Sequence, residues 1–97
     1  MNNYVVLLRY THQGAQNIKD SPARLDAARK LFASMGAKLN EWYLVFGQYD
    51  AVITAEAPDD ETVAKLLLAV GSLGNVRTEC LRAFNEGEYR KIIAALP

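Results

Sequence analysis

The segment Gly47-Gln48-Tyr49-Asp50 separates two apolar runs, which extend from Trp42 to Phe46 and from Ala51 to Ala55. Short apolar runs bounded by turn residues are typical of strands, and a short glycine-containing connection typically joins two antiparallel strands. The segment therefore predicts a hairpin in the middle of the chain, with a tight turn at residues 47–49. It also places an aromatic ring and a carboxylate beside buried strands.

Strands and helices are predicted on both sides of this hairpin. Runs of β-branched and aromatic residues indicate strands, whereas apolar residues at helical spacing indicate helices. We expect strands over residues 4–10, 38–46, 50–57 and 75–84, and helices over residues 21–35, 59–70 and 85–96. Residues 11–20 have no clear period and predict a loop with one helical turn.

Helix ends are marked by local signals. Ser21 followed by Pro22 predicts an N-cap hydroxyl and a proline at the first helical position. The acidic run that begins at Asp59 suits the positive end of a helix dipole. Asn85 and Glu88 have the spacing of a capping box.

The order β-α-β-β-α-β with a short C-terminal helix predicts a ferredoxin-like α+β fold, formed by residues 1–97 as one domain. Right-handed crossovers place both main helices on one face of a four-stranded antiparallel sheet. With strand one between strands four and three, the expected strand order is 4-1-3-2.

Alternation along the strands separates two faces. One set lacks charge and suits the helix layer: Tyr4, Val6, Leu8, Tyr10, Ala51, Ile53, Ala55, Val76, Thr78 and Cys80. The other set is mixed: Val5, Leu7, Arg9, Val52, Thr54, Glu56, Arg77, Glu79 and Leu81. Because a solvated face should not gather so much apolar surface, we expect the mixed face to meet another subunit, as a homodimer or higher homo-oligomer of dimeric α/β-barrel type.

Composition limits the remaining classes of function. Eleven basic and eleven acidic residues balance, so no long-range field favours nucleic acid or an anionic membrane. The first apolar run is too short to span a bilayer, which makes the cytoplasm the expected compartment. The single cysteine, Cys80, is expected to be a small buried hydrophobe.

The mixed face also supplies the candidate ligand-binding residues Arg9, Trp42, Thr54 and Arg77, with Tyr49 and Asp50 at its rim. One hypothesis is a charged network of Arg9, Arg77 and Glu79 that fixes a dimer. The other is a carboxylate- or phosphate-binding pocket in which an arginine provides a bidentate fork. Trp42 would be an apolar wall of this pocket or a packing residue at the interface.

Two residues have both a structural and a functional interpretation. The Asp50 carboxylate is expected to accept backbone N–H groups and lock the turn, with Gly47 in a conformation other residues avoid; it could also border a ligand. His12 is the one histidine and the natural candidate for a general base, or is simply a surface residue. No cluster has metal-ligand spacing, so neither a metal nor a cofactor is expected.

Taken together, the segments NIKDSP, RLDAAR, GQYD, GSLGNVRT, LRAF and EY resemble the GYD-domain family, named for its Gly-x-Tyr-Asp-like turn. The resemblance implies a ferredoxin-like fold and self-association, and no enzymatic activity. The hairpin is also similar, more faintly, to the ligand-sensing domain of Lrp/AsnC-type regulators, in which small molecules bind between subunits.

Three functions are compatible with these residues. The first is a homo-oligomeric module that binds or senses a small anionic metabolite in a cleft between subunits. The second is a small cofactor-independent enzyme of the dimeric α/β-barrel type, with His12 as its base. The third is a structural interaction module in which the same charges only fix the dimer.

Overall fold

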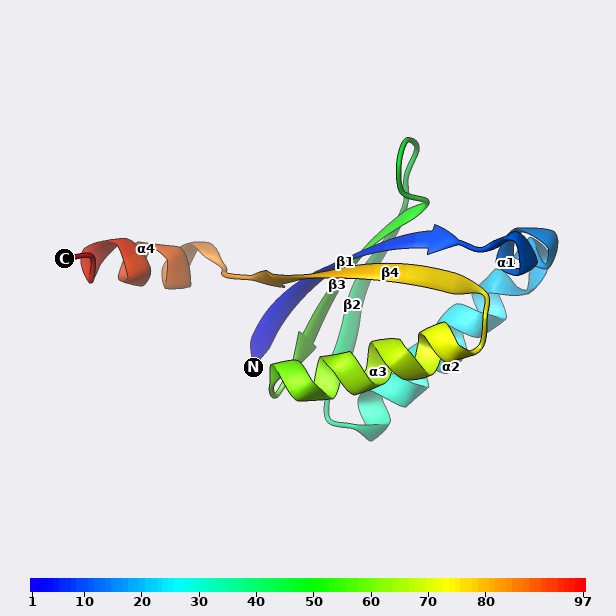
Figure 1. The fold of residues 1–97 in the computed structure, drawn as a ribbon. Coiled ribbons are helices and arrows are strands. Elements are labelled where there is room, and N and C mark those ends of the chain that lie inside the picture. Colours follow the sequence, from blue (N-terminus) through cyan, green and yellow to red (C-terminus); the bar gives the residue numbers. More distant parts are fainter.

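The computed structural model describes all residues from Met1 to Pro97 and has the ferredoxin-like arrangement expected from the sequence (Figure 1). Its elements are β1 (Asn2–Tyr10), α1 (His12–Gln16), a 3₁₀ turn (Ile18–Asp20), α2 (Ser21–Ser34), β2 (Lys38–Leu44), β3 (Ala51–Ala57), α3 (Asp60–Ser72), β4 (Val76–Ala83) and α4 (Glu86–Ala94). The strands form one antiparallel sheet in the order β2-β3-β1-β4, which confirms the predicted order.

Helices α2 and α3 cover one face of this sheet, and the core lies between them and the strands (Figure 1). Alternate residues of the central strands β1 and β3 point into this core, so the uncharged set is buried in these two strands apart from Tyr10, whereas its β4 members Val76 and Thr78 are only partly buried. The fully or nearly buried members are Tyr4, Val6, Leu8, Ala51, Ile53, Ala55 and Ala57 from the strands, with Phe32, Val63 and Leu66 from the helices.

The predicted acidic start of α3 and the predicted capping box of α4 are confirmed, and Asp59 is in addition the N-cap of α3, a role that was not predicted for it. The Asp59 carboxylate accepts hydrogen bonds from the Thr62 hydroxyl at 2.7 Å and from the Thr62 backbone N–H at 2.8 Å, and these bonds lower the pKa of Asp59. Asn85 and Glu88 form a reciprocal capping box at the start of α4. Both signals are local, because a cap needs only residues within one turn of the helix end.

Ser21 is not the N-cap of α2. The preceding residue, Asp20, occupies that position in a helical conformation and makes no side-chain capping bond. A 3₁₀ turn continues directly into α2, and the Ser21 N–H donates to the carbonyl of Ile18. Ser21 therefore lacks the extended backbone that a capping residue requires.

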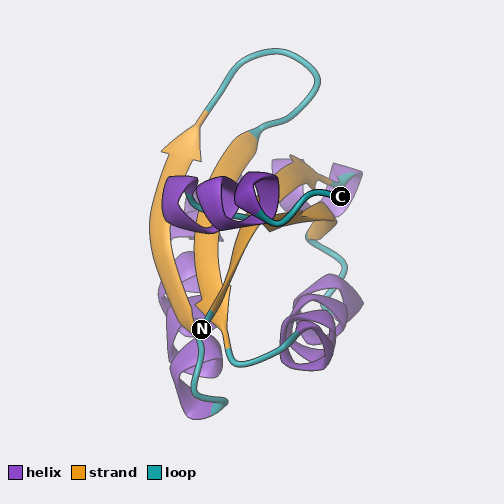
Figure 2. Cartoon of the chain, turned by 90° about the vertical axis from the view of Figure 1, so that its left-hand side faces the viewer, coloured by secondary structure: helices purple, strands orange, loops and turns teal.

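The hairpin connection is longer than predicted, because β2 ends at Leu44 and the chain loops out over residues 45–50 (Figure 2). A hydrogen bond of 2.9 Å from the N–H of Val45 to the carbonyl of Asp50 closes this loop at its base. Gly47 has a φ of 111°, as its predicted role requires, and the neighbouring Phe46 is 100% exposed.

Cys80 is exposed, so the expectation of a buried thiol was wrong. The residue points to the helix side of the sheet, opposite Val6, but β4 is an edge strand and has a neighbouring strand on one side only. Partial desolvation, with a contribution from the Asp60 carboxylate, raises the pKa of the Cys80 thiol.

None of the helices combines the length and the apolar character needed to cross a membrane. The C-terminal helix α4 projects from the end of β4, away from the other helices (Figure 1).

The short helix α1 packs against the start of β4 through Gly14. This glycine is buried, and a Cβ built on it would lie 2.0 Å from the backbone carbonyl oxygen of Asn75. Thr11 tightens the same junction, because its hydroxyl donates to the carbonyl of Gly74 at 2.6 Å. Only a residue without a side chain allows this close approach.

Gly14→Ala is therefore expected to lower the free energy of unfolding by about 1–3 kcal/mol, the usual cost of overpacking. Gly71→Ala is the matched control, because nothing lies within 4 Å of its Cβ position. Alanine in a helix is more favourable than glycine by about 0.5–1 kcal/mol, so the control should be neutral or stabilising. Urea denaturation followed by circular dichroism measures both; equal effects would contradict the close approach.

Candidate functional site

The face of the sheet opposite α2 and α3, called the open face below, carries the predicted mixture of apolar and charged side chains. Strand register places Val5 opposite Thr54 and Leu81, and Leu7 opposite Val52 and Glu79. Val5, Leu7 and Val52 are partly exposed, and Leu81 is 46% exposed. An apolar centre on this face is thus left accessible within the chain.

At one end of the open face, two arginines lie directly opposite each other. Arg9 of β1 pairs in register with Arg77 of β4, and neither guanidinium forms an ion pair within the chain. Like charges that face each other across strands are destabilising. A negative charge near this point would offset the repulsion between the two guanidiniums.

Arg9 is held in place by the hairpin loop. Its Nε donates to the carbonyl of Gln48 at 2.6 Å, and its guanidinium carbon lies 4.6 Å from the centre of the Tyr49 ring. The Tyr49 hydroxyl in turn donates to the carboxylate of Glu79. This hydrogen bond raises the pKa of Tyr49, and the nearby Arg9 charge opposes the rise. Arg9, Tyr49, Glu79 and Arg77 are together called the arginine cluster.

Asp50 supports this cluster from behind. Its carboxylate accepts a hydrogen bond from the backbone N–H of Tyr10 at 2.9 Å, and its own N–H donates to the carbonyl of Leu8 at 2.8 Å. The carboxylate thus has the backbone partner expected for a structural role, although that partner lies on β1 and not within the turn. These bonds fix the loop that carries Tyr49.

Thr54 shares the open face but lies away from the arginine cluster. It is opposite Val5, four residues along β1 from Arg9, and its hydroxyl accepts the N–H of Glu41 at 3.0 Å. That N–H follows an irregularity in β2 between Leu39 and Glu41. Thr54 therefore satisfies a backbone group of the neighbouring strand.

Trp42 lies on the other side of the sheet. Strict alternation from Lys38, which is opposite Glu56, would place Trp42 on the open face. The irregularity between Leu39 and Glu41 adds one residue, and the alternation is inverted beyond it. Trp42 is consequently opposite Ile53 and borders a cavity under the helices.

His12 begins α1 and is exposed, and its imidazole takes part in no hydrogen bond or ion pair. No group of three or more histidine, cysteine or acidic residues could hold a metal ion. The structure thus brings together Arg9, Tyr49, Asp50 and Arg77, and separates Thr54, Trp42 and His12 from them.

A cavity between the helices and the sheet, lined in part by Arg24 of α2, was not predicted from the sequence. The one sequence feature that points to this cavity is the small side chain of Ala28 in the apolar stripe of α2, because a larger residue there would fill the space. The helical spacing of the apolar residues in α2 predicted that they pack against the sheet. It does not indicate how far α2 and α3 diverge.

Comparison with solved structures agrees with this fold. The feast or famine regulatory protein of Mycobacterium tuberculosis, solved with L-methionine, matches with a TM-score of 0.67 and 20% identity over 88% of this chain. The match covers 51% of that regulator, so the chain spans about half of its length. The protein TTHA0845 of Thermus thermophilus matches with a TM-score of 0.56 and 29% identity, covering 88% of this chain and 95% of that one.

Sequence comparison defines the family. A glutamine synthetase and cystathionine β-lyase binding protein of Thermus thermophilus is 34% identical over 84 residues, which cover 86% of this chain and 88% of that relative. The GYD domain model matches residues 4–93. The chain therefore belongs to the GYD-domain family, and the resemblance to Lrp/AsnC-type regulators is confirmed at the level of the fold.

The contact between Tyr49 and Glu79 predicts a measurable titration. The Tyr49 hydroxyl should titrate above the ordinary tyrosine pKa, because losing its proton breaks the bond to Glu79 and places two negative charges side by side. Glu79→Ala should lower this pKa, and Glu86→Ala on α4 is the control. NMR of ring-labelled tyrosine as a function of pH measures it; an unchanged Tyr49 pKa in Glu79→Ala would contradict the contact.

Proposed function

We propose that this protein is a self-associating binding module whose open face meets a second copy of the chain. A small anion, a carboxylate or phosphate, binds at the arginine cluster where the two copies meet. The observation that supports this most directly is the Arg9–Arg77 pair, two guanidiniums in register with no acidic partner, at the edge of an exposed apolar surface.

The apolar centre supplies the driving force for association. Removing apolar surface from water contributes about 25 cal/mol per Å2, so each 100 Å2 contributes about 2.5 kcal/mol before the cost of association. Val5, Leu7, Val52 and Leu81 form a continuous patch in the register of three strands. A second copy presents the same patch, as a two-fold interface requires.

The arginine cluster supplies selectivity for the ligand. Arg9 is oriented by Gln48 and Tyr49, so little side-chain freedom is lost when its remaining N–H groups bind an anion. Arg77 is free of intramolecular ion pairs and adds the second charge. Guanidinium groups suit carboxylate and phosphate because they offer paired N–H donors.

A second candidate function follows from the Thermus thermophilus relative, which is named for binding two enzymes. The identity of 34% over most of both chains favours a related role, in which the open face or an exposed loop contacts an enzyme. Purified glutamine synthetase and cystathionine β-lyase, passed over immobilised protein, test this directly. Binding that is lost when Phe46, fully exposed in the hairpin loop, is changed to Ser would support it; no retention of either enzyme would contradict it.

The enzymatic alternative has His12 as its base, and no second acid–base group contacts that imidazole. It predicts a turnover that His12→Ala abolishes. The binding module predicts that His12→Ala leaves ligand affinity unchanged.

The oligomeric state tests the interface. We expect the protein to be a dimer or larger at micromolar concentration in light scattering, and Leu81→Lys to shift it to the monomer by placing a charge in the apolar patch. Leu68→Lys is the control, because Leu68 is 75% exposed on α3, which covers the other face of the sheet. A monomeric wild-type protein, or equal effects of both variants, would contradict the proposal.

The anion site is tested with citrate, glutamate and inorganic phosphate in a thermal-shift titration. At least one should raise the melting temperature, and Arg9→Ala or Arg77→Ala should weaken its binding by about tenfold or more, since a hydrogen bond to a charged group contributes about 1.5–3 kcal/mol. Arg29→Ala on the exposed side of α2 should leave the affinity unchanged. If none of these anions raises the melting temperature, the anion site is wrong.

A further inference from the structure

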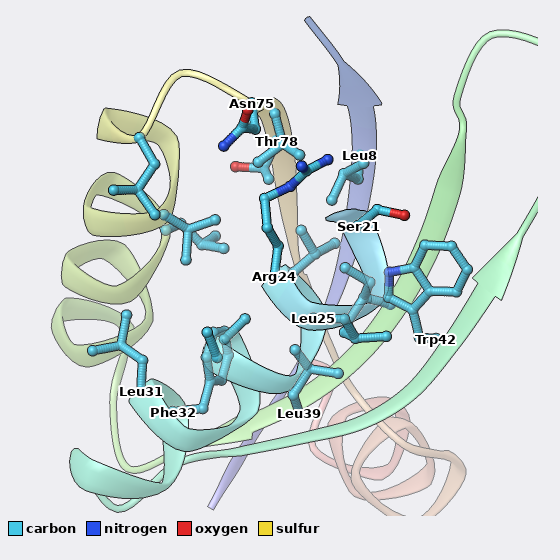
Figure 3. A pocket seen from close by; sticks show the side chains of 18 of the residues that line it. Leu8, Ser21, Arg24, Leu25, Leu31, Phe32, Leu39, Trp42, Asn75 and Thr78 are labelled. Atoms are coloured by element: carbon cyan, nitrogen blue, oxygen red, sulfur yellow. The ribbon is translucent and has the colours of Figure 1, made fainter. Parts of the chain in front are cut away.

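A cavity of about 370 Å3 lies between α2, α3 and the helix side of the sheet, on the face opposite the arginine cluster. It exists because α2 and α3 diverge as they cross the sheet, and the two ribbons separate toward the Ser21 end of α2 (Figure 3). Its walls are almost entirely apolar and come from the sheet and from both helices. They include Val6, Leu8, Trp42 and Ile53 from the strands, Leu25, Ala28 and Leu31 from α2, and Leu67 and Val70 from α3. Cavities of this size accommodate small organic molecules.

Polar groups gather at one end of the cavity. Figure 3 shows Arg24 reaching along the wall toward the end where Asn75 and Thr78 lie, with Ser21 beside it. Arg24 is the one charged residue among those that line the cavity, and no carboxylate is present among them. The cavity therefore combines a long apolar space with a single positive charge.

Arg24 is held in place by the backbone of the preceding segment. Its Nη1 donates to the carbonyl of Asn17 at 2.9 Å, and its Nη2 donates to the carbonyl of Gly14 at 3.4 Å. A guanidinium has five N–H donors, so three remain for a ligand. These carbonyls orient the Arg24 guanidinium at the cavity, and because they are uncharged its positive charge is not neutralised.

Asn75 adds a second donor at the same end. Gln13 Nε2 donates to Asn75 Oδ1 at 3.0 Å, and the amide nitrogen of Asn75 donates no hydrogen bond within the chain. An anionic group placed between Arg24 and Asn75 would satisfy both residues.

We propose that this cavity binds a monocarboxylic acid with an apolar body, with its carboxylate at Arg24 and its hydrocarbon part between α2 and α3. A single negative charge matches the single guanidinium, whereas a dianionic phosphate would bring one charge without a partner into an apolar space. The site is separate from the arginine cluster, so the two proposals can fail independently.

Octanoate is the probe. Octan-1-ol is the control without the negative charge, and acetate is the control without the apolar body. Trp42 is the single tryptophan and borders the cavity, so its fluorescence reports occupancy directly. Octanoate, titrated below its micelle concentration, should change this fluorescence to saturation. Octan-1-ol should bind about tenfold or more weakly, as expected for the loss of a charge-assisted hydrogen bond, and acetate should not saturate the signal.

Two variants test the two halves of the site. Arg24→Gln should weaken octanoate binding by about tenfold or more while leaving octan-1-ol binding unchanged, with Arg29→Gln on the same helix as its control. Ala28→Leu should reduce binding of both ligands by filling the cavity, and it keeps the test available if Arg24→Gln does not fold. Circular dichroism establishes folding of each variant.

Equal affinity for octanoate and octan-1-ol, or undiminished octanoate binding by folded Ala28→Leu, would overturn the proposal. The proposal would also be overturned if the Trp42 fluorescence did not respond to octanoate but changed with protein concentration. A second copy of the chain would then cover the cavity.

Discussion

The hydrogen bonds of Asp50 hold three strands together at one point, and the geometry of the arginine cluster depends on them. The carboxylate accepts the N–H of Tyr10 at the end of β1, the backbone N–H donates to Leu8 of the same strand, and the carbonyl receives the N–H of Val45 beyond β2. The three partners, the N–H of Tyr10, the carbonyl of Leu8 and the N–H of Val45, are backbone groups at the end of the sheet, where an unpaired buried group would cost free energy. Because the loop is fixed there, Tyr49 is brought under Arg9 and within reach of Glu79.

The sheet separates two kinds of chemistry. On the open face, an apolar patch ends in two guanidiniums that lack acidic partners, an arrangement suited to an interface that closes over an anion. On the helix side, diverging helices leave an apolar cavity with one fixed arginine. Both faces thus pair an apolar surface with arginine side chains that form no ion pair within the chain, although acidic and basic residues balance over the whole sequence.

Local signals in the sequence predicted most of the fold, and features set by distant contacts were missed. The acidic start of α3 and the capping box at Asn85 were predicted correctly because such signals depend on one helical turn. Cys80 was misassigned because its exposure depends on β4 being an edge strand. Trp42 was placed on the wrong side because one extra residue in β2 inverts the alternation beyond it. The divergence of α2 and α3 leaves no periodic trace in the sequence, so the cavity could not be predicted.

Leu8 and Arg9 are consecutive residues of β1, yet one borders the cavity and the other belongs to the arginine cluster. Since strand side chains alternate, inserting or deleting one residue in β1 before Leu8 would exchange the two environments in a single step, moving a guanidinium toward the core and a leucine outward. We therefore expect natural variants of this chain to change length at the termini, while the spacing within β1 and the length of the hairpin loop that carries Tyr49 and Asp50 stay constant. Differences in length would then mark the parts of the chain on which neither surface depends.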